Sequence, residues 1–99
     1  IVPLDAGSIK DILFQLKGEM DDIFAVVGGH HEGKATISII ISENIVDRTD
    51  LHAGNLVRSA AKNIQGGGGG QPFFATAGGK NPQGLEAAIE EVKKAFLNA

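Results

Sequence analysis

The chain has 99 residues, 42% of them hydrophobic, and a formal net charge of -3. Because a chain of this size buries about two thirds of its unfolded surface, we expect one globular domain over residues 1–99. The absence of cysteine excludes disulfides and cysteine-based zinc sites and fits a cytoplasmic protein, and no apolar run approaches the roughly 20 residues of a membrane span. The acidic excess restricts any nucleic-acid contact to a local surface.

The first half of the chain is predicted to form a helix and an antiparallel hairpin. Apolar residues at helical spacing follow a good N-cap, Ser8, so we expect a helix over residues 9–17. The apolar run 23–27 predicts a central strand that is buried on both faces. Residues 35–42 alternate apolar and polar side chains except at Ile40, which predicts a strand half open to water.

The second half is predicted to form a helix, a strand and a helix. Residues 50–65 carry an apolar stripe at helical spacing, and 73–77 have the content of a strand. Asn81 is suited to cap the last helix, with Pro82 at its first position. The order of elements predicts an α/β domain in which a small mixed β-sheet of about three to five strands packs with about three helices. Residues 1–4 have the content of a further strand.

Five consecutive glycines are the most distinctive feature of the chain, and they are Gly66, Gly67, Gly68, Gly69 and Gly70. Because glycine has no Cβ and reaches positive φ, such a run lets backbone N–H groups approach a ligand, at an entropic cost that a structural loop would avoid. The run is therefore either a linker or a binding surface. Its position inside a short chain, between an amphipathic helix and a strand, favours the binding surface.

One stripe of the predicted helix 50–65 is polar and cationic and carries no acid; it consists of His52, Asn55, Ser59 and Lys62, and Arg58 lies near it. This stripe leads into the glycine run. His52 taken alone has two interpretations, a phosphate contact or an exposed polar residue in the first helical turn.

Two places along the chain are predicted to offer backbone N–H groups to an anion. The glycine run can form a concave nest of N–H groups. Gly78, Gly79 and Lys80 precede the last helix, where the helix dipole favours a negative charge. With the cationic stripe, these places predict phosphate contacts made by shape rather than by base reading. The alternative is two tight turns and an ordinary solvated helix face.

No residue pattern predicts catalysis. His30 and His31 are neighbours in a strand, where adjacent side chains point to opposite faces, so a shared metal is not expected. The glycine run follows a helix and precedes a strand, which matches neither a P-loop nor a dinucleotide fingerprint. We therefore expect no catalytic residue, no metal ligand and no cofactor in this chain.

Several strings in fixed order resemble the C-terminal domain of alanyl-tRNA synthetase, a globular DHHA1-type module. The matching residues are His52, Gly54, Arg58, Gly66–Gly70, Pro72, Ala75, Ala77, Gly78 and Gly79. The resemblance covers essentially the whole chain and is specific, because these strings rarely occur together.

The resemblance implies a domain that binds the outer corner of tRNA and helps to couple aminoacylation with editing of mischarged tRNA. The candidate RNA-binding residues are His52, Asn55, Arg58, Lys62, Gly66, Gly67, Gly68, Gly69, Gly70, Gln71, Gly78, Gly79 and Lys80. The parent enzyme is expected to be an ATP-dependent alanine-tRNA ligase that uses Mg and Zn in upstream domains. Because the chain begins at Ile1 rather than Met, we expect a piece of that longer protein.

The resemblance leaves three other interpretations open. Free-standing proteins that deacylate mischarged tRNA carry a related tail. DHH-type phosphodiesterases do so too, but their glycine run is typically followed by His, where this chain has Gln71. The module can also be a protein-interaction domain without RNA binding. The family places a self-associating helical segment before the module, and without that segment self-association stays open.

Overall fold

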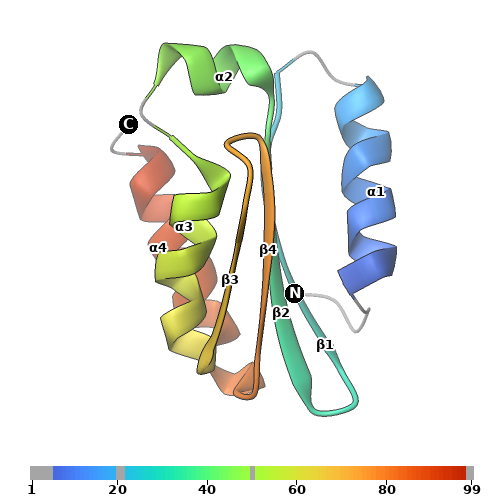
Figure 1. Cartoon of the computed structure of the whole chain (residues 1–99), viewed down its shortest axis with the longest axis vertical. Coiled ribbons are helices and arrows are strands. Elements are labelled where there is room, and N and C mark those ends of the chain that lie inside the picture. The colour runs from blue at the N-terminus through green and yellow to red at the C-terminus, as the bar shows by residue number, and fades with distance from the viewer. Residues whose placement is uncertain (1–5, 20–21, 50, 98–99) are drawn as a thin grey trace.

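The computed structural model describes residues 6–19, 22–49 and 51–97. Its elements in chain order are α1 (Ala6–Glu19), β1 (Phe24–His31), β2 (Lys34–Ile41), α2 (Glu43–Arg48), α3 (Ala53–Ala60), the 3-10 helix η1 (Ala61–Ile64), β3 (Gly66–Gly70), β4 (Phe74–Gly79), the 3-10 helix η2 (Pro82–Gly84) and α4 (Leu85–Leu97). Figure 1 shows the sheet between α1 on one side and the pair α3 and α4 on the other. The strand predicted at residues 1–4 lies outside the described residues.

The four described strands form one sheet in the order β1-β2-β4-β3, and neighbouring strands are antiparallel in every pair. The α/β class with a small sheet is therefore confirmed, and where a mixed sheet was predicted, all pairs among the described strands are antiparallel. Short connections account for two of these three pairs. The turn at Glu32 and Gly33, both at positive φ, closes the β1–β2 hairpin, and residues 71–73 join β3 to β4. Connections this short permit only antiparallel pairing.

β2, not β1, is the strand buried on both faces. The apolar run 23–27 was predicted to be central, but among the described strands β1 lies at an edge, and its first four residues are only half-buried. β2 lies between β1 and β4, and Ser38 on its predicted wet face is fully buried. There the Ser38 Oγ lies 3.0 Å from the Thr76 Oγ1 of β4, so the hydroxyl is hydrogen-bonded within the sheet.

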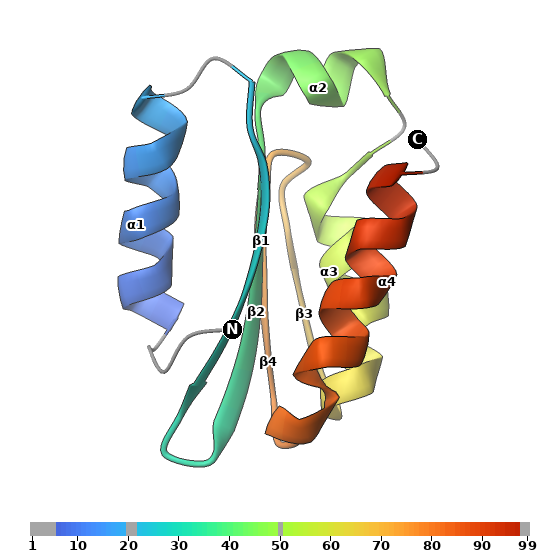
Figure 2. The same ribbon diagram turned by 180° about the vertical axis from the view of Figure 1, so that it is seen from behind.

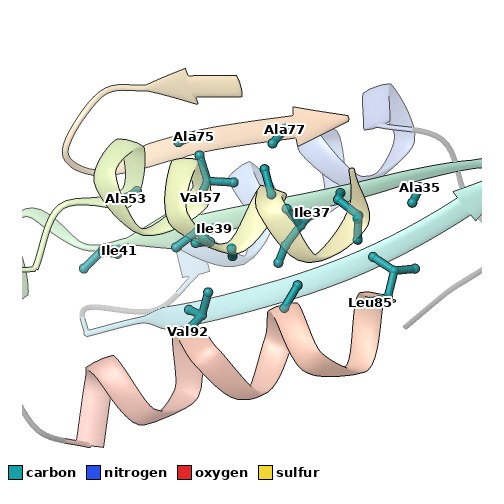
Figure 3. Packing of buried hydrophobic residues seen from close by; sticks show 14 of the residues in the cluster. Ala35, Ile37, Ile39, Ile41, Ala53, Val57, Ala75, Ala77, Leu85 and Val92 are labelled. Carbon is teal, nitrogen blue, oxygen red and sulfur yellow. The ribbon is translucent and has the colours of Figure 1, made fainter. Parts of the chain in front are cut away.

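The sheet carries a large apolar layer on one face and a small one on the other. The large layer joins alternate residues of β2 and β4 to α3, η1 and α4, and it includes Ile37, Ile39, Val57, Ala77 and Val92 (Figure 3). The small layer lies under α1 and consists of Ile9, Leu13, Ile23 and Ile40. Ile40, the exception to the alternation in the sequence, thus faces α1. In the reverse view, α1 and α4 lie on opposite sides of the sheet (Figure 2).

The helices differ from the prediction mainly at their ends. α1 begins at Ala6, so Ser8 lies inside the helix and is not its N-cap. The predicted helix 50–65 is α3 continued by η1, and Gln65, at φ +55°, ends it in the left-handed conformation. The last helix begins as η2 at Pro82, and the Asn81 side chain makes no capping hydrogen bond.

Helix α2 was not predicted from the sequence. Its N-cap position is Ser42, whose hydroxyl accepts a hydrogen bond from the Ile23 N–H at 3.1 Å rather than capping the helix. A helix of six residues with β-branched Ile45 and Val46 has little intrinsic propensity, so tertiary contacts decide its presence. None of the helices in the described ranges is long and apolar enough to span a membrane.

Candidate nucleic-acid interface

The glycine run is a β-strand at the edge of the sheet. Gly66–Gly70 forms β3, which pairs along its whole length with β4 (Figure 1). The linker interpretation is therefore wrong. The predicted concave nest is wrong too, because a nest is built from successive residues in right- and left-handed helical conformations, whereas these residues are extended. Because β4 is the only strand beside β3, the other edge of its backbone has no strand partner among the described residues.

Close approach to β4 explains three of the five glycines. A Cβ at Gly66 or Gly68 would lie 1.9 Å or 2.4 Å from a carbonyl oxygen of β4, and one at Gly70 would lie 2.6 Å from the Phe74 oxygen. Gly67 and Gly69 differ, because a Cβ at Gly67 would meet nothing within 4 Å and one at Gly69 only the Arg58 Nη2 at 3.4 Å. The run thus combines packing positions with two open ones.

α3 lies against β3 with its backbone almost in contact. A Cβ at Gly54 would be 2.7 Å from the Gly70 oxygen, and the Gly54 N–H donates to the Gln71 oxygen at 3.3 Å. Gly54 was matched in the sequence but was not a candidate site residue. The sequence carried a signal for the role of Gly54, because a glycine inside a helix lowers helix stability by about 1 kcal/mol and its presence there indicates close packing.

His52 caps α3. Its Nδ1 accepts the Asn55 N–H at 3.2 Å, so the neutral ring carries its proton on Nε2. Neither of the two interpretations of His52 included this role. Arg58 lies one helical turn after Asn55 and is exposed, and its Nη1 is 3.4 Å from the Asn55 Oδ1. The structure thus holds Asn55 and Arg58 side by side next to the glycine strand.

The remaining candidates extend the same edge. Gln71 follows β3 at one end, where its N–H donates to the Phe74 oxygen, and Lys62 is an exposed residue of η1 at the other. Gly78 and Gly79 pair with Gly67 and Gly66. The structure therefore gathers the candidate residues along α3, η1 and β3, with Lys80 directly after β4. We call the surface formed by the candidate residues His52, Asn55, Arg58, Lys62, Gly66–Gly70, Gln71, Gly78, Gly79 and Lys80 the glycine edge.

Two backbone N–H groups of the second predicted anion site are already engaged within the fold. The N–H groups of Lys80 and Asn81 both donate to the Ile64 oxygen, at 2.9 Å and 3.0 Å, so they are not free to bind a phosphate. Gly79 also has a packing role, since a Cβ there would lie 2.2 Å from the same oxygen. These backbone groups join η1 to the end of β4.

Within residues 6–19, 22–49 and 51–97, no group of three or more His, Asp or Glu side chains could hold a metal ion. His30 and His31 are both exposed at the end of β1, and the His31 Nε2 lies 3.7 Å from Glu32.

Comparison with protein families matches residues 3–98 to the model described as the DHHA1 domain. The chain belongs to the DHHA1 domain family. Among curated relatives, this DHHA1 domain is 55% identical over 92 residues to an alanine–tRNA ligase of Christiangramia forsetii, covering 93% of this chain and 11% of that protein. It is 56% identical over 91 residues to the alanine–tRNA ligase of Bacteroides thetaiotaomicron, covering 91% and 10%. The chain thus spans about a tenth of the length of these relatives.

The DHHA1 domain also resembles a solved structure, described as the C-Ala domain from Aquifex aeolicus alanyl-tRNA synthetase. The TM-score is 0.82 at 22% sequence identity, over 95% of this chain and 83% of that one. The two chains therefore share a fold.

Alanine substitutions at neighbouring glycines should separate packing from exposure in this DHHA1 domain. Gly68→Ala should lower the free energy of unfolding by about 1–3 kcal/mol, because its Cβ meets the β4 backbone. Gly67→Ala should be neutral or stabilise by up to about 1 kcal/mol, since its Cβ meets open space. Urea unfolding measures both, and equal losses would contradict the described pairing of β3 with β4.

Removing the cap from α3 should also be measurable. His52→Ala should cost about 0.5–2 kcal/mol, because the Asn55 N–H loses its acceptor. His52→Asn should recover most of that loss, since an Asn side chain is a strong N-cap. Thermal or urea unfolding of the three proteins tests the role, and an Asn variant as unstable as the Ala variant would argue against it.

Proposed function

We propose that this chain is the C-terminal domain of an alanyl-tRNA synthetase and that it binds the outer corner of tRNA. Relatives that are 55% and 56% identical to it are named alanine–tRNA ligase, and a C-Ala domain shares its fold. In this proposal the parent enzyme attaches alanine to tRNA(Ala) with ATP, in the cytoplasm. The domain itself is non-catalytic and helps to bring the aminoacylation and editing centres to one tRNA. ATP, Mg and Zn belong to the upstream domains.

The observation that carries the RNA contact is the make-up of the glycine edge. Asn55, Arg58 and Lys62 are exposed on α3 and η1, and they lie along a strand without side chains whose outer backbone edge has no strand partner in the described part. No candidate residue of this edge is acidic. A backbone surface bordered by cations fits the sugar-phosphate chain of a folded RNA, which is contacted by shape and charge rather than by base identity.

The small number of cations on the glycine edge limits the strength of the contact in a chain of net charge -3. With few cations at the interface, binding replaces few counterions, so the affinity of the isolated domain should be low and its salt slope shallow. Such an appendix adds to the affinity of the upstream domains through its high effective concentration on the same chain. This is the role that coupling between two distant active centres requires.

The phosphodiesterase alternative is disfavoured at Gln71. This residue stands where the phosphodiesterases typically have His, and its backbone N–H and oxygen are both engaged, with Phe74 and Gly54. A free-standing editing protein carries the same kind of tail and would use the same edge. Both alternatives differ from the proposal in the domains that precede residue 1.

Charge removal on the glycine edge should weaken tRNA binding. Arg58→Gln and Lys62→Gln should each lower the affinity of the 99-residue chain for intact tRNA a few-fold and reduce the salt slope by about one unit. Lys93→Gln on the outer face of α4 is the matched control, since Lys93 is exposed but lies outside this edge. Filter binding or fluorescence anisotropy at several salt concentrations measures the effect.

The shape of the tRNA provides the second arm of this experiment. Binding should fall when the D and T loops are changed so that the elbow cannot form. A plain RNA duplex of the same length should bind more weakly than intact tRNA. Equal affinity for both RNAs, or equal losses in the Lys93 control and the edge variants, would contradict the proposal.

A further inference from the structure

The face of the sheet under α1 is only partly covered. Among the described helices, α1 stands alone on this side of the sheet (Figures 1 and 2), packs mainly against β2 and β1, and meets β4 through the ring pair of Phe14 and Phe74. A hollow of about 300 Å³ opens there. Its lining comes from α1, the end of β3 and the start of β4: Lys10, Phe14, Gly69, Gly70, Gln71, Phe73, Phe74, Ala75 and Thr76. We call it the aromatic hollow.

Three phenylalanines give the hollow aromatic walls. The rings of Phe14 and Phe74 have centroids 4.9 Å apart and are tilted by 47°. Phe14 is 39% exposed, and Phe73 and Phe74 are half-buried. Exposed ring surface beside a cavity offers a stacking partner to a flat ligand.

Two lysines lie over these rings. The Lys10 Nζ is 6.0 Å from the centroids of both Phe14 and Phe74, and the Lys17 Nζ is 4.5 Å from that of Phe73. Among the described residues that line the hollow, Lys10 is the only one with a basic side chain, and none has a carboxylate. The rim can therefore receive an anionic group while the walls receive an apolar ring.

We infer that the aromatic hollow binds one unstacked base of an RNA, with Lys10 and Lys17 next to the adjoining phosphates. Aromatic rings under a cationic rim are the elements with which proteins bind single-stranded nucleic acid. The volume is at the low end of small-molecule pockets, which suits one ring system.

The hollow is continuous with the glycine edge, because Gly69, Gly70 and Gln71 belong to both. This inference rests on the proposed RNA-binding function and adds a base contact on a second side of β3. An apolar side chain of a protein partner is the competing occupant, but it would gain nothing from the cationic rim.

Nucleotide titration of the isotope-labelled 99-residue chain, followed by NMR, tests the hollow directly. Guanosine 5′-monophosphate should shift the ring signals of Phe14, Phe73 and Phe74. Ribose 5-phosphate, which has the phosphate but no base, should leave the ring signals unchanged. N-acetyl-leucine amide tests the competing occupant, and shifts as large as those with the nucleotide would overturn the inference in favour of a protein side chain.

Variants of α1 provide matched controls. Phe14→Ala should weaken nucleotide binding at least about fivefold, through the loss of a stacking ring. Phe14→Leu keeps an apolar side chain that supports folding but has no aromatic ring, so it should weaken nucleotide binding to a similar extent. Ile12→Ala removes an apolar residue of the same helix, 47% exposed and outside the lining, and should have no effect. Unchanged binding in both well-folded Phe14 variants would overturn the inference.

The outcomes for tRNA separate this inference from the proposed function. Salt-sensitive tRNA binding that depends on Arg58 and Lys62 but not on Phe14 would remove the hollow and leave the function standing. Nucleotide shifts without measurable tRNA binding would support the hollow and remove the tRNA-corner role.

Discussion

The approach of β3 to β4 and α3 at backbone contact distance is the constraint that shapes this domain. At Gly66, Gly68 and Gly70 any side chain would enter the β4 backbone, and at Gly54 it would enter Gly70. The pairing therefore rests on main-chain hydrogen bonds, and glycine, whose freedom in the unfolded chain makes it entropically costly, is kept where nothing else fits. The same constraint leaves a side-chain-free edge beside Arg58, so the packing requirement and the candidate interface arise from one feature.

The two faces of the sheet have different roles: one carries most of the core, and the other carries the exposed aromatic surface. The α3–α4 face holds the large apolar layer, which contains most of the buried apolar residues of the described core. The α1 face buries only a small cluster and leaves three phenylalanines at an open hollow. A domain with one complete core layer can keep the other face partly open without losing its fold. The exposed aromatic surface lies on that lighter face.

Charge placement reconciles an acidic chain with an RNA partner. The overall charge of -3 would oppose long-range attraction, but electrostatic contact is screened beyond about 10 Å at moderate salt. Arg58, Lys62, Lys10 and Lys17 lie on α3, η1 and α1, around the two sides of β3. Local cations can therefore act at short range. Weak binding of this kind suits a domain that works as part of a longer chain.

The sequence by itself determined the family resemblance, most of the elements and the inner face of β2, because these depend on local strings and on the alternation at Ile37 and Ile39. It also identified the polar stripe beside Arg58, since helical spacing places those residues together. Only the tertiary structure decided that the glycine run is an edge strand and that β2 is central, because strand pairing is non-local and glycine carries no side-chain pattern. The same holds for the aromatic hollow, whose walls come from segments about 60 residues apart that meet only when α1 packs on the sheet.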